Sequence, residues 1–148
     1  MLSYQHGFHA GNFADVLKHT ALTRLLAYLS LKEKPYFYFE THSGKGLYDL
    51  KDYQAEKTGE YKQGIQLLHA AAKSLPSVFG DYLRVIKALN TNNQLRYYPG
   101  SPYLAINALR EQDRGYICEL HPTEFDTLST IPRLGKKIHI SHSDGIET

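Results

Sequence analysis

The fold of this chain is decided by one stretch, Pro35-Tyr-Phe-Tyr-Phe-Glu40-Thr-His42-Ser-Gly44-Lys-Gly46. An aromatic run bounded by a proline and a glycine-bearing turn predicts a short strand that is buried on both faces. The strand ends in Glu40, and a glycine-containing loop follows. Such a loop lets backbone N–H groups approach a ligand, while the acid can hold a cationic or hydroxyl-bearing group. An ordinary turn has the same local pattern, so this stretch alone supports either reading.

Two later segments repeat the pattern of a short apolar strand that ends in an acid. Residues 115–120 end at Glu119-Leu120, and residues 138–145 end at Asp144-Gly145. Helices are expected between the strands, one starting at Ser101-Pro102 and one at Pro122. This βαβ order predicts an α/β fold with a parallel sheet. The ligand of such a sheet lies across the carboxyl ends of its strands, so Glu40, Glu119 and Asp144 should converge there.

The first helix is expected to begin after Asn12, which is a good N-cap residue. Its apolar residues keep a helical spacing; they are Val16, Ala21, Leu22, Leu25, Leu26 and Leu29. Asn12, Asp15 and His19 form a polar stripe beside that apolar face. A solvated or capping pair explains Asp15 and His19 as readily as a site does. Residues 1–11 have no helical period and are expected to form an irregular arm.

Residues 51–95 carry helical periods in a different register. We expect two helices there, over about residues 58–73 and 79–89, followed by a turn at Asn90. This helical insertion would separate the glycine loop from the helix that normally follows it. Ser101 would then cap a helix whose positive end faces the ligand.

Composition sets broader bounds on the protein. A chain of 148 residues with 42% hydrophobic content is enough for one domain, residues 1–148. The net charge of +2 permits a nucleic-acid partner without demanding one. Twelve tyrosines and six phenylalanines without tryptophan suit either stacking surfaces or strand positions. The single Cys118, the lack of a signal peptide and the lack of a membrane span predict a cytoplasmic protein.

Five motifs in this order resemble the bacterial large-subunit (23S) ribosomal RNA adenine-N6 methyltransferase family RlmJ. They are Tyr4-x-His6-x-Phe8-His9-Ala-Gly11-Asn12-x-Ala-Asp15-Val-Leu-Lys18-His19, Thr41-His42-x-Gly44-x-Gly46, Gln94-Leu-Arg-Tyr-Tyr-Pro-Gly-Ser101-Pro102, Glu119-Leu-His-Pro and Asp144-Gly145. The ordered match spans nearly the whole chain and is far more specific than any one part.

The resemblance implies a Rossmann-like class I methyltransferase sheet that uses S-adenosylmethionine. It assigns the cofactor to His19, His42, Ser101, Glu119, Asp144 and Gly145. Glu119 would accept hydrogen bonds from the ribose hydroxyls, and Asp144 would accept one from the adenine amine of the cofactor. His42 stands where the usual fingerprint has its first glycine, so the turn there is expected to differ.

The resemblance also implies N6-methylation of an adenosine in 23S ribosomal RNA. Enzymes of this kind carry Asp-Pro-Pro-Tyr after the fourth strand, and these 148 residues contain no such sequence. We therefore expect the chain to be the amino-terminal part of a longer enzyme, monomeric when full length, with an incomplete sheet and the catalytic aspartate beyond Thr148. Tyr4, His6 and Lys18 are the candidates for contact with RNA, unless the arm only packs on the sheet.

Two other classes of function fit parts of the sequence. A metal site built from His6, His9, Asp15 and His19 lacks a fixed ligand spacing and a cysteine partner, so we expect no metal. A non-catalytic RNA-binding or interaction module would use the aromatic arm and the inserted helices without chemistry. This second alternative stays open at the level of sequence.

Overall fold

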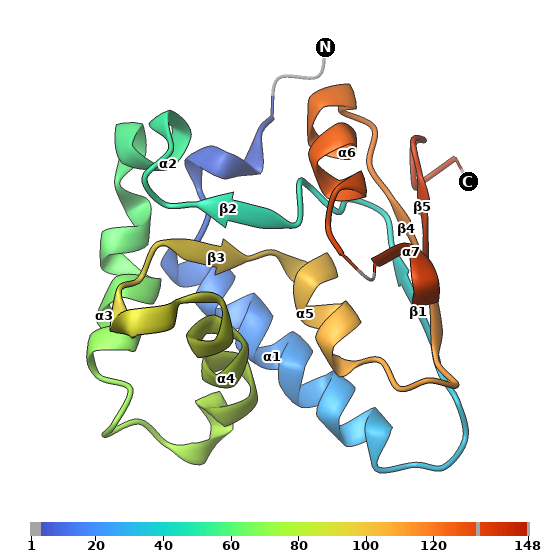
Figure 1. Ribbon diagram of the computed structural model, residues 1–148, viewed down its shortest axis with the longest axis horizontal. Coiled ribbons are helices and arrows are strands. Elements are labelled where there is room, and N and C mark those ends of the chain that lie inside the picture. The colour runs from blue at the N-terminus through green and yellow to red at the C-terminus, as the bar shows by residue number, and fades with distance from the viewer. Residues whose placement is uncertain (1–3, 133, 148) are drawn as a thin grey trace.

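A three-stranded parallel sheet forms one side of the molecule (Figure 1). The computed structural model describes residues 4–132 and 134–147. The strands are β1 (Phe37–Glu40), β4 (Arg114–Cys118) and β5 (Ile138–Ser141), in the order β1-β4-β5. In the register of the sheet Glu40 lies opposite Ile117, and Cys118 lies opposite Ser141. The α/β fold with parallel strands is thus confirmed, and the acid-bearing ends of the strands lie at one edge.

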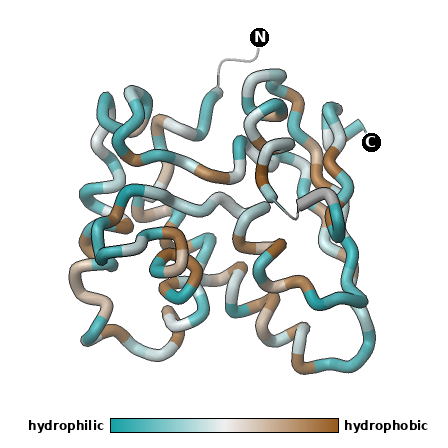
Figure 2. Tube along the Cα trace, in the orientation of Figure 1, coloured by the Kyte–Doolittle hydropathy of each residue, from teal (hydrophilic) through white to brown (hydrophobic). Residues whose placement is uncertain are grey.

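Helices cover one face of this sheet. They are α1 (Phe13–Ser30), α5 (Ser101–Ala108), α6 (Pro122–Ser129) and the short α7 (Leu134–Lys137). Apolar residues of α1, α5 and α6 pack with the inner residues of the strands into one core cluster, which contains Leu26, Ala105, Leu109, Ile117, Leu128, Ile131 and Ile138. Figure 2 shows hydrophobic residues along these strands, whereas the connection between α1 and β1 is mostly hydrophilic.

The opposite face of the sheet is open to solvent. Phe37 is 63% exposed and Phe39 is 49% exposed, so the expectation that this strand is buried on both faces was wrong. On that face Phe39 stacks on Tyr116, which in turn stacks on His139. An aromatic run indicates a strand, but it does not indicate how many of its faces are covered.

A second core lies beside α1, away from the parallel sheet. It is built around an antiparallel pair, β2 (Leu47–Asp49) and β3 (Tyr97–Pro99). Three helices, α2 (Tyr53–Thr58), α3 (Ile65–Ala70) and α4 (Gly80–Leu89), pack around this pair. Short 3₁₀ turns occur at His6–Phe8, Glu60–Gln63, Ser77–Phe79 and Thr91–Asn93. The fully buried members of this core include Ile65, Tyr82, Ile86 and Tyr98.

The inserted segment matches the sequence prediction only in its second half. Helix α4 ends at Leu89 as expected, but the single helix predicted over residues 58–73 is wrong. Gly59 ends α2 with a φ of +64°, and Gly64 stands before α3. A Cβ on Gly64 would lie 2.2 Å from the carbonyl oxygen of Gly11, so only glycine fits this close crossing of two chain segments.

The buried side of α1 is more polar than its sequence indicates. Asp15, His19, Thr20 and Thr23 are buried there with Leu26. Ala21 and Leu25 were expected on the apolar face and are exposed, as are Phe13 and Leu17. The reading of Asp15 and His19 as a solvated pair was therefore wrong. The irregular arm expected before α1 is also partly wrong, because it contains the 3₁₀ turn at His6–Phe8.

Among the described residues, no helix has the length and apolar character needed to cross a membrane.

Candidate functional site

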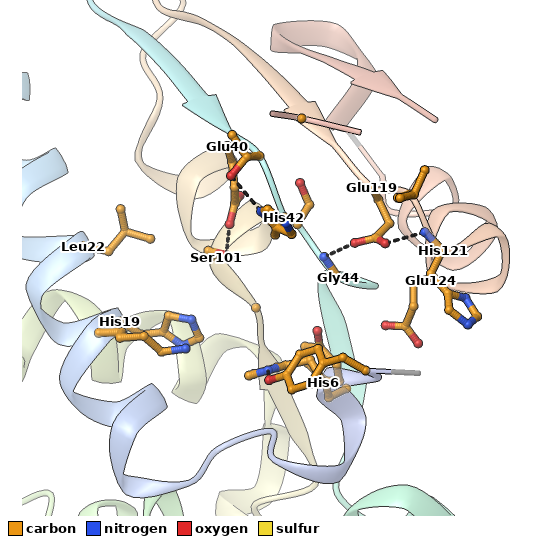
Figure 3. Close-up of a pocket in the computed structure, with 18 of the residues that line it drawn as sticks. His6, His19, Leu22, Glu40, His42, Gly44, Ser101, Glu119, His121 and Glu124 are labelled. Atoms are coloured by element: carbon orange, nitrogen blue, oxygen red, sulfur yellow. Dashed lines mark hydrogen bonds between the residues drawn. The ribbon is translucent and has the colours of Figure 1, made fainter. Parts of the chain in front are cut away.

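A pocket of about 570 Å³ opens at the carboxyl ends of β1, β4 and β5, with the sheet and α5 on one side and α1 with its preceding arm on the other (Figure 3). Its volume lies in the range of small-molecule sites. Every residue that the sequence analysis assigned to cofactor or RNA lines it: Tyr4, His6, Lys18, His19, His42, Ser101, Glu119, Asp144 and Gly145. Glu40 lines it too, so the three strand-end acids do converge.

The α1 wall is organised around the carboxylate of Asp15, which is completely buried. Asn12 caps the helix by accepting a hydrogen bond from the Asp15 N–H at 2.9 Å. One oxygen of Asp15 lies 2.7 Å from His6 Nε2 and accepts the N–H of Gly11 at 3.0 Å. The other oxygen lies 2.8 Å from the Lys18 ammonium. The carboxylate of Asp15 therefore connects the arm to the first turns of α1.

Tyr4 joins this group from the exposed side, because its hydroxyl lies 2.8 Å from His6 Nδ1. Its ring also stacks on the ring of His9 at a centroid distance of 5.7 Å. The tyrosine is 66% exposed at the rim of the pocket. An aromatic ring in this position is accessible to a base, which is consistent with the predicted contact with RNA.

The histidines considered for a metal site go to different partners. His9 lies 3.0 Å from a carboxylate oxygen of Glu60, and His19 bonds to Tyr98, while only His6 contacts Asp15. Within residues 4–132 and 134–147, no group of three or more His, Cys, Asp or Glu side chains is arranged to hold a metal ion.

His19 lies deeper in the α1 wall and is 5% exposed. Burial lowers the pKa of its imidazole to about 4, against the opposing charge of Asp15. The ring is therefore neutral at pH 7. Its Nδ1 lies 2.7 Å from the hydroxyl of Tyr98 in β3, so the second core supports this side of the pocket.

On the sheet wall, Glu40 accepts hydrogen bonds from two hydroxyl groups. Tyr38 donates to one oxygen at 2.9 Å, and Ser101 donates to the other. Burial raises the pKa of Glu40 to about 7, although both hydrogen bonds oppose the shift. The expected capping role of Ser101 was wrong: Gly100 is the N-cap of α5, and the Ser101 hydroxyl is directed to Glu40. Helix α5 ends at Ala108.

Glu119 holds the glycine loop against the end of β4. Its two oxygens accept the N–H groups of Gly44 and His121, each at 2.7 Å (Figure 3). Gly44 and Gly46 have φ values of +62° and +72°, a region that favours glycine. Each carboxylate oxygen has a second lone pair, so Glu119 can still accept hydrogen bonds from a ligand. His42 lines the pocket from the same loop, where its Nδ1 lies 2.8 Å from the Thr41 hydroxyl.

Two residues of this loop region were missed by the sequence analysis. Glu124, in the first turn of α6, is buried and accepts the N–H of Lys45 at 3.1 Å. Ser43 is also buried, and its hydroxyl has no hydrogen-bond partner among the described residues. Both line the pocket. The acidic residue two positions after Pro122 was the only signal for Glu124, and such acids are common in helix first turns.

The end of β5 completes the sheet wall. Asp144 accepts the N–H of Ile146 at 2.9 Å. Gly145 is buried against the loop after β1, where a Cβ would lie 2.5 Å from the Cα and the carbonyl oxygen of Thr41. The absence of a side chain at Gly145 thus brings the ends of two strands together. The assignment of both residues to the cofactor stays a prediction.

The family model described as "Ribosomal RNA large subunit methyltransferase D, RlmJ" matches residues 33–148. The chain belongs to the RlmJ family. Two curated relatives are named "Ribosomal RNA large subunit methyltransferase J": the Escherichia coli protein is 44% identical over 147 residues, and the Haemophilus influenzae protein is 47% identical over 148. Each alignment covers 99% of this chain and 52% of the relative, so the chain spans about half the length of these RlmJ proteins.

A solved structure has the same fold. The crystal structure of protein LPL1258 from Legionella pneumophila is 57% identical in sequence and superposes with a TM-score of 0.87. The match covers 94% of this chain and 51% of that chain. The resemblance to RlmJ inferred from five motifs is therefore confirmed.

Proposed function

We propose that this chain forms the cofactor-binding part of an RlmJ-type enzyme, which methylates N6 of an adenosine in 23S ribosomal RNA with S-adenosylmethionine. One observation carries the proposal: nine residues from the arm, α1, the glycine loop, α5 and two strand ends line a single pocket. Within the domain of residues 1–148, we assign residues 51–95 to a helical insertion that supports the α1 side of this pocket.

The chemistry of the pocket suits a ligand with cationic groups. Four carboxylate side chains line it, from Glu40, Glu119, Glu124 and Asp144, against the single lysine Lys18. S-adenosylmethionine carries an ammonium and a sulfonium group, both of which such carboxylates would stabilise. The buried Ser43 hydroxyl, which has no partner among the described residues, offers a further hydrogen bond to a ligand. These features fit the cofactor that the family name implies.

Each wall of the pocket would have its own task. Glu119 would accept the ribose hydroxyls with its free lone pairs, and Asp144 would accept the adenine amine. His19, His42, Ser101 and Gly145 would complete the cofactor site, while Tyr4, His6 and Lys18 at the rim would face the RNA. The cofactor supplies a sulfonium methyl group that is already activated, so the protein mainly has to align and desolvate the adenine amine. We assign that alignment to an Asp-Pro-Pro-Tyr segment, which these 148 residues do not contain.

Equilibrium dialysis with labelled S-adenosylmethionine tests the cofactor site. We expect saturable binding that Glu119→Ala weakens by roughly 1–3 kcal/mol, the range for losing hydrogen bonds to a charged group. Glu111→Ala is the matched control, because its side chain is 94% exposed and lies outside this pocket. Circular dichroism checks that the Glu119 variant keeps its fold, since Glu119 also holds the glycine loop.

Two results would overturn the proposal. If neither this chain nor a version of the full family length binds the cofactor, the enzyme assignment fails. RNA binding without cofactor binding would then favour the alternative of a non-catalytic RNA-binding module. An unchanged affinity in a folded Glu119→Ala variant would instead show that the ribose lies elsewhere in the pocket.

A further inference from the structure

A buried row of three polar groups leads from the second core to the pocket. The hydroxyl of Tyr82 in α4 lies 2.9 Å from the hydroxyl of Tyr98 in β3, which lies 2.7 Å from His19 Nδ1 in α1. Both tyrosines are 0% exposed, and His19 is 5% exposed at the wall of the pocket (Figure 3). The rings of His19 and Tyr98 also stack, at 5.7 Å and 28°. The imidazole is thus fixed in both position and plane.

The available donors and acceptors decide in which direction the hydroxyl hydrogens of Tyr82 and Tyr98 point. If Tyr82 donates to Tyr98 and Tyr98 donates to His19 Nδ1, both hydroxyl hydrogens are used. In the reverse direction, His19 donates to Tyr98 and Tyr98 donates to Tyr82, so the Tyr82 hydrogen has no acceptor among the described residues. The neighbours of Tyr82 in this core include the apolar side chains of Ile65 and Ile86. A buried donor without a partner is costly, so the first direction is favoured.

The favoured direction determines what His19 offers to a ligand. A neutral imidazole carries one hydrogen, and an Nδ1 that accepts from Tyr98 leaves that hydrogen on Nε2. The Nε2 atom has no hydrogen-bond partner among the described residues, and His19 lines the pocket. The side chain would therefore act as a donor there, suited to an anionic group and unsuited to an ammonium.

We propose that Tyr98, supported by Tyr82, is a positioning residue that holds His19 with its hydrogen on Nε2, where it donates to the carboxylate of the bound cofactor. This inference rests on the proposed function for the identity of the ligand, but the state of the histidine is independent of it. It gives the inserted helical segment a role in cofactor binding, because Tyr82 belongs to α4.

Nitrogen-15 NMR of the histidine side chains in the ligand-free chain tests the row directly. We expect Nε2 of His19 to be the protonated nitrogen at pH 7, and Tyr98→Phe to produce a mixture of the two tautomers. Tyr61→Phe is the matched control: Tyr61 is buried in the same core, but its hydroxyl bonds to Glu56. A hydrogen on Nδ1 in the unmodified chain would overturn the proposal, as would an unchanged His19 spectrum in a folded Tyr98→Phe variant.

A comparison of two ligands tests what His19 recognises. Tyr98→Phe should weaken S-adenosylmethionine about twofold, because a ligand that needs the hydrogen on Nε2 binds in proportion to the fraction of chains that carry it there, and should leave the affinity for decarboxylated S-adenosylmethionine unchanged. Equal losses for both ligands would contradict the carboxylate assignment. If neither ligand binds the unmodified chain or a version of the full family length, the proposed function fails, whereas the NMR measurement still decides whether the row exists.

Discussion

Two carboxyl groups at the pocket, Asp15 buried behind its α1 wall and Glu40 in its sheet wall, have pKa values that move in opposite directions. Asp15 on the α1 side is buried, which favours its neutral form, but its hydrogen bond to His6, its electrostatic interaction with His6 and its hydrogen bond to Lys18 outweigh burial and lower its pKa. Burial dominates for Glu40 on the sheet side and raises its pKa to about 7. The neighbours explain the difference, since Asp15 is bonded to an imidazole and an ammonium group, and Glu40 to two hydroxyls.

This contrast indicates that the carboxyl groups of the two walls differ in their bonding before a ligand binds. The α1 wall is a complete charge network before any ligand binds, so its carboxylate has a structural task. In the part of the chain that the structure describes, the carboxyl group of Glu40 is bonded to two neutral donors and to no cation, which leaves it suited to a cationic ligand. Substitutions in the two walls should therefore affect stability in different ways.

Asp15→Asn should have the largest effect on stability. The variant keeps the shape of the side chain but loses the charge that His6, Lys18 and the Gly11 N–H share, so we expect a loss of about 2–3 kcal/mol in the free energy of unfolding. Urea denaturation at pH 7 measures it. Asp81→Asn is the control, because Asp81 also pairs with two cations, Arg24 and Arg84, but lies at the surface, where such pairs contribute less than about 1 kcal/mol.

The pH dependence of this loss checks its cause. The pKa of Asp15 is lowered in the folded state, so its contribution is fully present above its ordinary pKa of 3.8 and is lost as the pH falls through the folded pKa. The stability difference between the original protein and Asp15→Asn should shrink accordingly below about pH 4. A stability difference that does not depend on pH would indicate a packing defect, and it would contradict the explanation of the two walls by charge.

Glu40→Gln should have a smaller effect of the opposite sign. The pKa of Glu40 is raised from 4.5 to about 7, so the folded protein binds a proton more tightly than the unfolded chain, and stability falls as the pH rises through that window. Glutamine has no proton to lose. Relative to the original protein, the variant should gain roughly 1–2 kcal/mol between pH 4.5 and pH 8, after a discount for partial exposure. Parallel stability curves for the two proteins would show that Glu40 titrates normally.

The sequence predicted one of these walls better than the other. Glu40, Glu119 and Asp144 could be assigned because each ends or closely follows a short strand, and parallel strands bring their carboxyl ends together. The support of His19 in the α1 wall depends on a contact between distant segments, and a linear pattern does not contain it. His19 and Tyr98 are 79 residues apart, and no periodicity connects them.

Local sequence patterns also gave wrong predictions where contacts between segments determine the structure. The apolar spacing over residues 58–73 suggested one helix, but Gly59 ends α2 in a left-handed conformation, and Gly64 stands where the chain crosses Gly11. The aromatic run of β1 predicted a strand correctly, yet its exposed face depends on what packs on the sheet and not on the strand itself. These features follow from packing between segments, which composition and periodicity do not report.

Lys18→Met should have the smallest effect on stability, although Lys18 contacts the same carboxylate as His6. Its side chain is 60% exposed, so solvent screens the pair with Asp15, and we expect a loss of about 0.5 kcal/mol. RNA binding should respond more strongly, since an exposed ammonium at the rim can contact a phosphate. Fluorescence anisotropy with an adenosine-containing RNA hairpin, read at two salt concentrations, measures this, and Lys73→Met on the exposed surface away from the pocket is the control. A loss of stability near that of Asp15→Asn, with RNA affinity unchanged, would move Lys18 from the RNA-facing rim into the structural network of the α1 wall.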